Sequence, residues 1–195
     1  MTGKTGLVIL AAGGSSRLGR PKQLLMHQGR TLLGRAADIA LASGCDPVVV
    51  VIAPGADEVA RAVIDLPVTC VVNEAWQSGI GTSIRAGVSR VKQADCDAVV
   101  IMLCDQPLVT CKLIQQLTNG RGKAADAISA CYYDDSLGVP ALFGSALFDD
   151  LLSLPDTSGA KALILRHHDR VTKIPFPEAA VDIDTPDDLT FITLL

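Results

Sequence analysis

The chain has 195 residues, of which 49% are apolar and only 4% aromatic, and its net charge is −4 at neutral pH. A general nucleic-acid binder is usually basic, so this balance argues against that class of protein. No apolar run approaches the roughly 18 residues of a membrane helix, and residues 1–6 contain no signal-type stretch. We therefore expect one α/β domain over residues 1–195, cytoplasmic, with neither a membrane segment nor a nucleic-acid partner.

The six cysteines do not form a metal or disulfide pattern. None stands in a Cys-x-x-Cys pair, and no histidine lies at metal-motif spacing from two of them. Cys70, Cys104 and Cys131 lie in or beside apolar runs, where a free thiol behaves as a small buried hydrophobe. We expect reduced, structural thiols.

The stretch from Leu7 to Leu25 is the most informative. An apolar strand over 7–12 leads into the pair Gly13 and Gly14, and three cations follow within a few residues, including Arg17 and Lys22. Tandem glycine lets the backbone take unusual angles and approach a ligand, and successive free N–H groups form an anion-binding concavity. The stretch predicts a loop that holds a triphosphate; the alternative is a turn with a few solvated cations.

Two better-known phosphate motifs do not fit this stretch. A Walker loop ends in Gly-Lys-Ser or Gly-Lys-Thr, but Gly19 is followed by Arg20 and Pro21. A Rossmann fingerprint needs Gly-x-Gly and an acidic residue after the second strand, but here the glycines are adjacent and 53–55 reads Ala-Pro-Gly. A nucleotide bound here would need a different loop.

Strands and helices alternate through the first half of the chain. A helix beginning at Thr31 or Leu32 should end at Gly44. The β-branched run at 48–52 is typical of a strand buried on both faces of a parallel sheet. The other expected elements are helix 57–64, strand 68–72, a helix from about Thr82, and strand 98–103. The pattern predicts a single doubly wound, mostly parallel sheet with helices on both faces.

Residues 73–83 follow the carboxyl end of a strand and open a helix. Ligands of open α/β sheets bind at such ends, and a helix N-terminus offers free N–H groups. The alternative is a structural role, with serine as an N-cap and Trp76 as packing. Asp105 follows strand 98–103 and precedes Pro107, where a carboxylate can hold a divalent metal or form an Asx turn.

The second half of the chain is more irregular. It should contain helix 113–117, loop 120–124, strand 127–132, helices 145–152 (with Ser145 as N-cap) and 160–167, and strand 170–174. His167 and His168 point in different directions on a helix, so they are poor joint metal ligands. Asp182 and Asp184 alternate on an extended segment before a helix capped by Thr185. Asp184 has no such explanation in the local sequence; a resemblance to a known family, given next, makes it a candidate metal ligand, with Asp182 as the weaker choice.

Taken together, these stretches resemble the molybdenum cofactor cytidylyltransferases, a branch of the molybdopterin nucleotidyltransferases. The motif LAAGxSxRxGxPKxLL matches 10–25, and NxxWxxGxxxS matches 73–83. DxP matches Asp105 to Pro107, and the family's Asp-x-Gly-Ala-Arg/Lys and second metal-binding segments resemble 156–161 and 181–189. The guanylyltransferase branch differs, with LAGG in the first loop and usually Asp in the place of Pro21.

The resemblance implies a Rossmann-like nucleotidyltransferase fold, with a nucleotide-binding half at about 1–110 and an acceptor-binding half at about 111–195. It implies catalytic roles for Lys22 and Arg17. Nucleotide contacts would come from Leu10, Ala11, Ala12, Gly13, Gly14, Lys22, Asn73, Gly79 and Ser83. Asp105 and Asp184 would hold Mg²⁺, with Arg85 as a nearby cation. Acceptor contacts are expected from Gly138, Pro140 and Lys161, although Leu137 stands where many relatives have a polar or basic residue.

The expected reaction transfers CMP from CTP to molybdopterin and releases pyrophosphate. Three alternatives stay open: GTP as the nucleotide, a sugar or alditol phosphate as the acceptor, or a noncatalytic protein that binds the finished cofactor for insertion. The resemblance also makes a molybdenum hydroxylase-type apoenzyme, or its insertion chaperone, a candidate partner.

Overall fold

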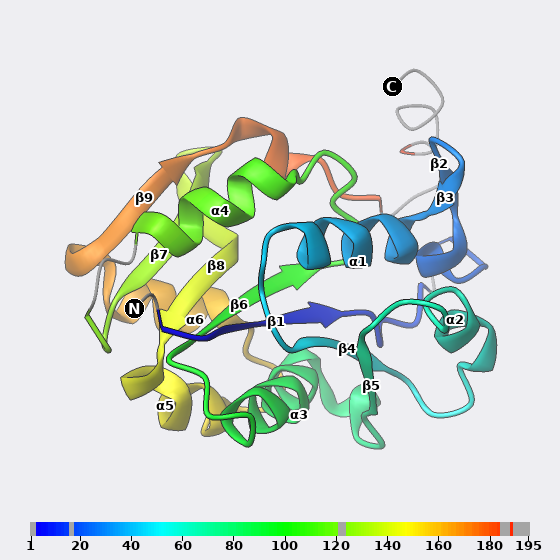
Figure 1. Ribbon diagram of the computed structural model, residues 1–195, viewed down its shortest axis with the longest axis horizontal. Coiled ribbons are helices and arrows are strands. Elements are labelled where there is room, and N and C mark those ends of the chain that lie inside the picture. Colours follow the sequence, from blue (N-terminus) through cyan, green and yellow to red (C-terminus); the bar gives the residue numbers. More distant parts are fainter. Residues whose placement is uncertain (1–2, 16–17, 121–123, 184–187, 189–195) are drawn as a thin grey trace.

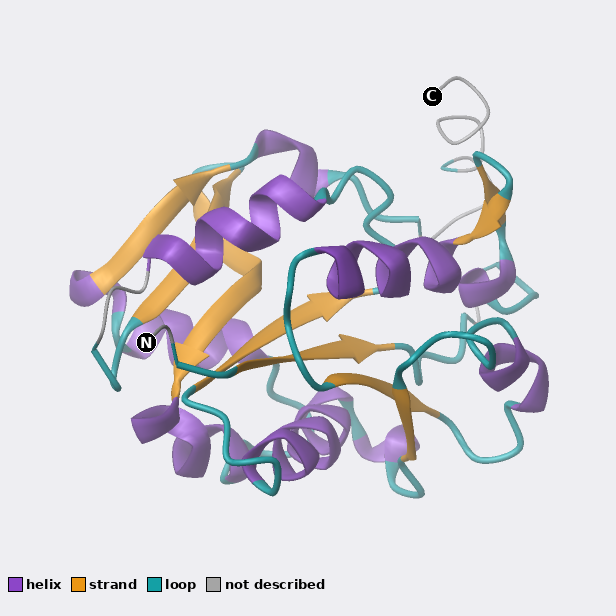
Figure 2. Cartoon of the chain, in the orientation of Figure 1, coloured by secondary structure: helices purple, strands orange, loops and turns teal. Residues whose placement is uncertain are grey.

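The computed structural model describes residues 3–15, 18–120, 124–183 and 188. A seven-stranded sheet of order β5-β4-β1-β6-β8-β7-β9 forms its centre, with helices on both faces (Figures 1 and 2). The strands are β1 (Thr5–Leu10), β4 (Val48–Ile52), β5 (Thr69–Val72), β6 (Ala98–Leu103), β7 (Ile128–Tyr133), β8 (Ser136–Gly144) and β9 (Val171–Pro175). The expected fold, a mostly parallel sheet between two layers of helices, is confirmed.

The helices are α1 (Leu32–Ala42), α2 (Asp57–Arg61), α3 (Ile80–Lys92), α4 (Cys111–Gly120), α5 (Phe148–Leu152) and α6 (Ala160–Arg166). Short 3-10 turns are η1 (Lys22–Leu24), η2 (Trp76–Ser78), η3 (Ser145–Leu147), η4 (His168–Arg170) and η5 (Pro177–Ala180). A small hairpin, β2 (Met26–His27) with β3 (Arg30–Thr31), leads into α1. In the part of the chain that is described, no helix is long and apolar enough to cross a membrane.

The sheet alternates its buried side chains between two cores, as the period of two along a strand requires. Leu7 and Ile9 of β1 face α1 and α4, whereas Val8 and Leu10 face α3 and the helices α5 and α6. Both faces of β1, β4 and β6 are therefore buried, which explains their continuous apolar sequences. Figure 1 shows α1 and α4 above the sheet and α3 and α5 below it, and α6 packs in the same core as α3 and α5.

Strand β8 was not predicted from the sequence. It runs antiparallel to both β6 and β7 and carries the chain between the two halves of the sheet. Gly138 and Pro140, both poor strand formers, lie within it and interrupt the alternation of residues that is typical of a strand. Residues 134–140, which include the expected acceptor residues Gly138 and Pro140, form a tight turn at Asp134 and Asp135 and then the first half of this strand.

Helix starts were predicted with mixed success. Thr31 caps α1, because its Oγ1 accepts a hydrogen bond of 3.0 Å from the Gly34 N–H. Helix α3 begins at Ile80, earlier than the expected Thr82. The expected N-cap role of Ser145 is wrong, because Ser145 is the first residue of η3 and its side chain caps no helix.

Candidate functional site

The loop after β1 leaves the middle of the sheet, between β4 and β6. Ala11 and Ala12 are buried, and the Ala11 N–H donates to the Val51 carbonyl at 2.9 Å. Gly13 and Gly14 then emerge into solvent. The loop thus starts at a carboxyl strand edge, where parallel sheets bind ligands. Arg17, expected to contact the triphosphate, lies outside the described residues.

The unusual backbone angles of this loop fall on residues other than those expected. Ser15 and Gly19 have φ of 49° and 65°, whereas Gly13 and Gly14 have no positive φ. Ser15 closes the loop: its Oγ accepts from the Lys22 N–H at 3.0 Å, and its carbonyl accepts from Gly19 at 3.2 Å. Gly14 is needed for space, since a Cβ there would lie 3.0 Å from the ring of Trp76.

Lys22 and Asp105 form an ion pair between this loop and the end of β6. The Lys22 Nζ contacts Asp105 Oδ2, and the side chains are only 15% and 8% exposed. The structure thus brings together two predicted site residues that are 83 positions apart in sequence. Sequence reasoning assigned Lys22 to the triphosphate and found no local partner for Asp105; the partner cation is Lys22 itself.

The second oxygen of Asp105 fits a metal ligand. Asp105 Oδ1 is buried and, within the described residues, has no hydrogen-bond partner. A buried carboxylate oxygen without a donor carries a large desolvation cost, and a hard divalent cation would satisfy it. The described residues contain no cluster of three or more His, Cys, Asp or Glu that could hold a metal. Further ligands would have to come from phosphate, water or Asp184.

The segment that leads to Asp184 runs beside Asp105. The Ile183 N–H donates to the Asp105 carbonyl at 3.1 Å, and Ile183 is fully buried. Asp184 itself lies outside the described residues. Asp182, the weaker candidate, is exposed, and its charge acts with burial to raise the pKa of Tyr133 to about 12.

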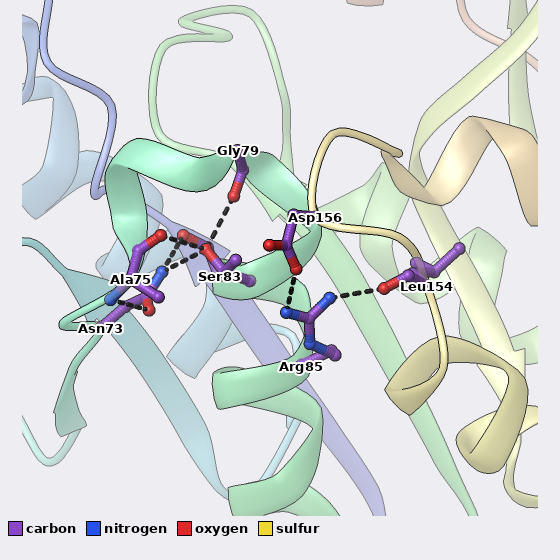
Figure 3. Close-up of polar contacts among 8 residues, drawn as sticks. Asn73, Ala75, Gly79, Ser83, Arg85, Leu154 and Asp156 are labelled. Atoms are coloured by element: carbon purple, nitrogen blue, oxygen red, sulfur yellow. Dashed lines mark hydrogen bonds and ion pairs between the residues drawn. The ribbon is translucent and has the colours of Figure 1, made fainter.

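Asn73 joins the end of β5 to the first turn of α3 (Figure 3). Its buried amide nitrogen donates to Thr82 Oγ1 at 2.8 Å and to Ser83 Oγ at 2.9 Å, and its oxygen accepts from Ala75 N–H at 3.1 Å. Both donors of the side chain are used, so only the oxygen retains capacity for a ligand. Asn73 and Ser83 are brought together as expected, but they are hydrogen-bonded to each other.

The first turn of α3 uses at least two of its N–H groups within the protein, those of Gly81 and Thr82. The Gly81 N–H donates to the Asp156 carbonyl at 2.8 Å, and a Cβ on Gly79 or Gly81 would collide with backbone atoms of residues 155–157. Arg85 reaches the same segment, donating to the Leu154 carbonyl and the Asp156 carboxylate at 2.5 Å each (Figure 3). Arg85 is therefore a clamp between α3 and the 154–157 segment.

The expected acceptor residues lie on two elements. Gly138 and Pro140 are buried in β8, and a Cβ on Gly138 would collide with the hydroxyl of Tyr133, which gives this glycine a packing role. Leu137 is buried as well, and its hydrocarbon side chain offers no polar contact. Lys161 is exposed in the first turn of α6. The geometry leaves Lys161 accessible to an anion and gives Gly138 and Pro140 no free polar atom other than backbone.

Two buried glutamines were missed by sequence reasoning. Gln23 directly follows Lys22, and Gln106 directly follows Asp105; they are 3% and 5% exposed. Each donates from its amide nitrogen to two backbone carbonyls of other segments. The available signal was an uncharged polar residue next to a predicted site residue and beside an apolar stretch.

The six thiols are all free, as expected. Burial, with the neighbouring Asp105 carboxylate, raises the pKa of Cys104, and burial raises the pKa of Cys131 to about 12. Both thiols therefore stay protonated near neutral pH and are poor nucleophiles. The expectation for Cys70 is wrong: it is exposed, because β5 is an edge strand.

Comparison with known proteins connects this geometry to a family. Residues 7–171 match the MobA-like NTP transferase domain. The molybdenum cofactor cytidylyltransferase of Escherichia coli (strain K12) is 26% identical over 187 residues, covering 95% of this chain and 93% of that protein. A probable molybdenum cofactor guanylyltransferase of Trichormus variabilis is 27% identical over 190 residues, covering 95% and 88%.

Other relatives match over a shorter part. The nicotine blue oxidoreductase of Paenarthrobacter nicotinovorans is 44% identical over 102 residues, which are 51% of this chain and 48% of that protein. The chain thus spans about half the length of this relative, and 26% of the bifunctional protein GlmU of Halorhodospira halophila, which it also matches.

Solved structures agree over the whole chain. The crystal structure of Rv0371c from Mycobacterium tuberculosis H37Rv has a TM-score of 0.83 at 30% identity, covering 100% of both chains. A manganese complex of that protein has a TM-score of 0.79 at 28% identity, again with full coverage of both. Since the family match extends from β1 to the start of β9, the chain belongs to the family of MobA-like NTP transferase domains.

Proposed function

We propose that the chain is a nucleotidyltransferase that transfers CMP from CTP to molybdopterin and releases pyrophosphate. The observation that carries this proposal is the buried Lys22–Asp105 ion pair at the end of β6, beside the open loop at Gly13 and Gly14. A cation, a carboxylate with a free oxygen and exposed backbone N–H groups are the parts that a triphosphate and its metal need.

The chemistry is a substitution at phosphorus. An oxygen of the acceptor phosphate attacks the α-phosphorus of CTP, a new P–O bond forms, and the bond to the β-phosphate oxygen breaks so that pyrophosphate leaves. The acceptor phosphate is already ionised at neutral pH, so no side chain has to remove a proton. Catalysis then depends on positioning and on neutralising phosphoryl charge, which are the roles of Lys22 and Arg17.

Asp105 and Asp184 would hold a divalent cation, proposed to be Mg²⁺, which would neutralise charge on the phosphates. The free Oδ1 of Asp105 supports this assignment, as does the manganese complex of a structural relative. The hydrogen bond from the Ile183 N–H to the Asp105 carbonyl supports the pairing of Asp105 with Asp184, because residue 184 follows directly in the chain.

The nucleotide would lie across the 10–14 loop and the 73–83 segment. The Leu10-Ala11-Ala12-Gly13 sequence favours cytosine, since the guanylyl branch has LAGG there. Gly79 and Ser83 shape the pocket, and the acceptor oxygen of Asn73 is the atom with capacity to accept from a base amino group. Relatives named for both cytidylyl and guanylyl transfer make GTP the competing nucleotide.

Molybdopterin would bind on the side of β8 and α6. Lys161 would contact its phosphate, and the backbone at Gly138 and Pro140 would line the pterin. Action in the cytoplasm and delivery of the product to a molybdenum hydroxylase-type apoenzyme, or to its insertion chaperone, complete the proposal. Sugar and alditol phosphates are the competing acceptors.

An oxidoreductase is a second candidate, favoured by the 44% identity with nicotine blue oxidoreductase over about half of the chain. The two candidates differ in what they consume. A transferase releases pyrophosphate from a nucleoside triphosphate, whereas an oxidoreductase changes the redox state of a nicotinamide or flavin cofactor.

The test is a pyrophosphate-release assay with each of the four nucleoside triphosphates, with and without molybdopterin, in Mg²⁺ or Mn²⁺. We expect release that needs molybdopterin and prefers CTP over GTP by about 1–3 kcal/mol in kcat/KM, roughly 10–200-fold. Equal kcat/KM for both would refute the base assignment alone. No pyrophosphate release with any of the four nucleotides, together with oxidation of NADH, would replace the transferase by the oxidoreductase.

A further inference from the structure

Gln23 is hydrogen-bonded to the backbone of residues 11–14, the loop after β1 that is called the phosphate loop from here on. It lies in η1, directly after Lys22, and is 3% exposed. Its amide nitrogen donates to the Ala11 carbonyl at 2.7 Å and to the Gly13 carbonyl at 2.9 Å. The side chain thus donates both of its amide protons to the loop that leaves β1, to carbonyls two residues apart.

The direction of these two bonds fixes the direction of two N–H groups. In a trans peptide the carbonyl of one residue and the N–H of the next point to opposite sides of the chain. Carbonyls of Ala11 and Gly13 that face Gln23 therefore turn the N–H groups of Ala12 and Gly14 away from it. The hydrogen bonds of the described residues include none donated by these two N–H groups.

The space beside Gly13 is open, and Gly14 lies next to it against the ring of Trp76. A Cβ built on Gly13 would have no atom within 4 Å, so a ligand can approach this peptide closely. The adjoining wall carries the Lys22–Asp105 ion pair. N–H groups of Ala12 and Gly14 that project here add two neutral donors to one cation, which is the arrangement that binds phosphate oxygens in backbone concavities.

The oxygen of the same side chain, Gln23 Oε1, is buried and makes no hydrogen bond within the described residues. An apolar side chain of similar size would avoid burying this polar atom. The contribution of glutamine at this position therefore lies in its two donated hydrogen bonds, and those act on the loop.

Gln106 provides an internal comparison. It is 5% exposed, it donates to the Val139 carbonyl at 3.3 Å and the Ala179 carbonyl at 2.9 Å, and its Oε1 is also without a partner in the described part of the chain. The two glutamines thus have the same burial and the same bonding. They differ in what they hold: the phosphate loop for Gln23, and β8 with η5 for Gln106.

We propose that Gln23 is a positioning residue that presets the Ala12 and Gly14 N–H groups to bind the phosphate chain of the nucleotide. The inference rests on the proposed nucleotide site and adds a residue that acts through the backbone. Lys22 neutralises charge on the phosphates, while Gln23 orients the two uncharged N–H donors.

The test compares Gln23→Met with Gln106→Met in the full chain. Dissociation constants for CTP and for pyrophosphate are measured by calorimetry with Mg²⁺, and thermal unfolding gives the stability of each variant. We expect Gln23→Met to weaken both ligands at least tenfold, about 1.4 kcal/mol. Gln106→Met should lower the unfolding temperature about as much as Gln23→Met does. It should nevertheless change both dissociation constants less than twofold.

A second measurement uses the wild-type protein and needs no variant to fold. Amide proton shifts of Ala12 and Gly14 are followed by NMR as pyrophosphate is added, and we expect both to move downfield as they donate to phosphate. Unchanged shifts there, or equal ligand affinity in Gln23→Met and wild type, would overturn the inference. If the wild type binds neither CTP nor pyrophosphate, the proposed function fails with it; tight CTP binding without turnover refutes the transferase alone.

Discussion

Lys22 and Asp105 meet as a buried ion pair, although one follows β1 and the other follows β6. The two strands are neighbours in the sheet, so their carboxyl ends carry the two side chains to one point. One carboxylate oxygen contacts the lysine and the other is free within the described residues. The pair therefore holds a positive group and an unused metal-type ligand side by side before any nucleotide arrives.

Replacing Lys22 by alanine should lower kcat by about 10²–10³ and raise the KM for CTP much less, because the charge matters most when phosphoryl charge builds up in the transition state. Steady-state kinetics with pyrophosphate detection measure both constants. Lys92→Ala, which removes an exposed ion pair with Asp149, is the matched control and should leave both unchanged. A near-normal kcat in Lys22→Ala would reduce this lysine to a structural partner of Asp105.

Replacing Asp105 by asparagine should nearly abolish turnover and weaken its dependence on the metal concentration. The Oδ1 that would face the metal loses its charge, and Lys22 loses its partner. The double variant with Lys22→Ala should be less damaging than the product of the single effects, because residues in direct contact are non-additive. Independent effects that multiply would show that the ion pair has no role in the reaction.

Six of the seven strands of the central sheet could be predicted from the sequence, including β7 and β9 of the second half, whereas the antiparallel strand β8 could not. The β-branched and apolar runs of β1, β4 and β6 are buried on both faces and carry a strong local signal. In β8 the signal is broken by Gly138 and Pro140, both poor strand formers, and Gly138 is required by its packing against Tyr133, which the local sequence does not reveal.

The sequence predicted candidate site residues but not the contacts that they make. Motif residues such as Asn73, Ser83 and Lys22 were identified, yet their partners are each other or distant segments. Local sequence carries no information on pairs 83 positions apart, as for Lys22 and Asp105. The clamps made by Gln23 and Arg85 were missed for the same reason, since each holds backbone atoms whose positions only the fold determines.

Gly81→Ala should destabilise the protein by about 1–3 kcal/mol, the usual cost of overpacking. The new methyl group would collide with the Pro155 carbonyl, at the point where the 154–157 segment docks on α3. Urea unfolding measures the change. Gly159→Ala is the control, because its Cβ would meet only Ile80 at an ordinary 3.7 Å, and equal stability of the two variants would contradict the docking described above.

Stability at alkaline pH should depend on Tyr133. Burial, together with the charge of Asp182, raises its pKa from 10.0 to about 12. Between these values the unfolded chain has lost the phenol proton and the folded chain retains it, so the free energy of unfolding falls as pH rises. Tyr133→Phe loses the 3.2 Å hydrogen bond to the Val139 carbonyl but should show a shallower fall between pH 10 and 12. Parallel profiles for the two proteins would remove this group from the alkaline transition.

The central claim is that the α-phosphoryl group of CTP is transferred to molybdopterin. It is tested most directly by incubating the protein with Mg²⁺, molybdopterin and CTP labelled with ³²P at either the α- or the γ-phosphate, and by separating the products chromatographically. The account predicts that the α-label appears in a molybdopterin dinucleotide and the γ-label in pyrophosphate, and that Asp105→Asn forms neither. An α-label that stays in CTP or CMP while wild-type protein, metal and acceptor are all present would contradict it.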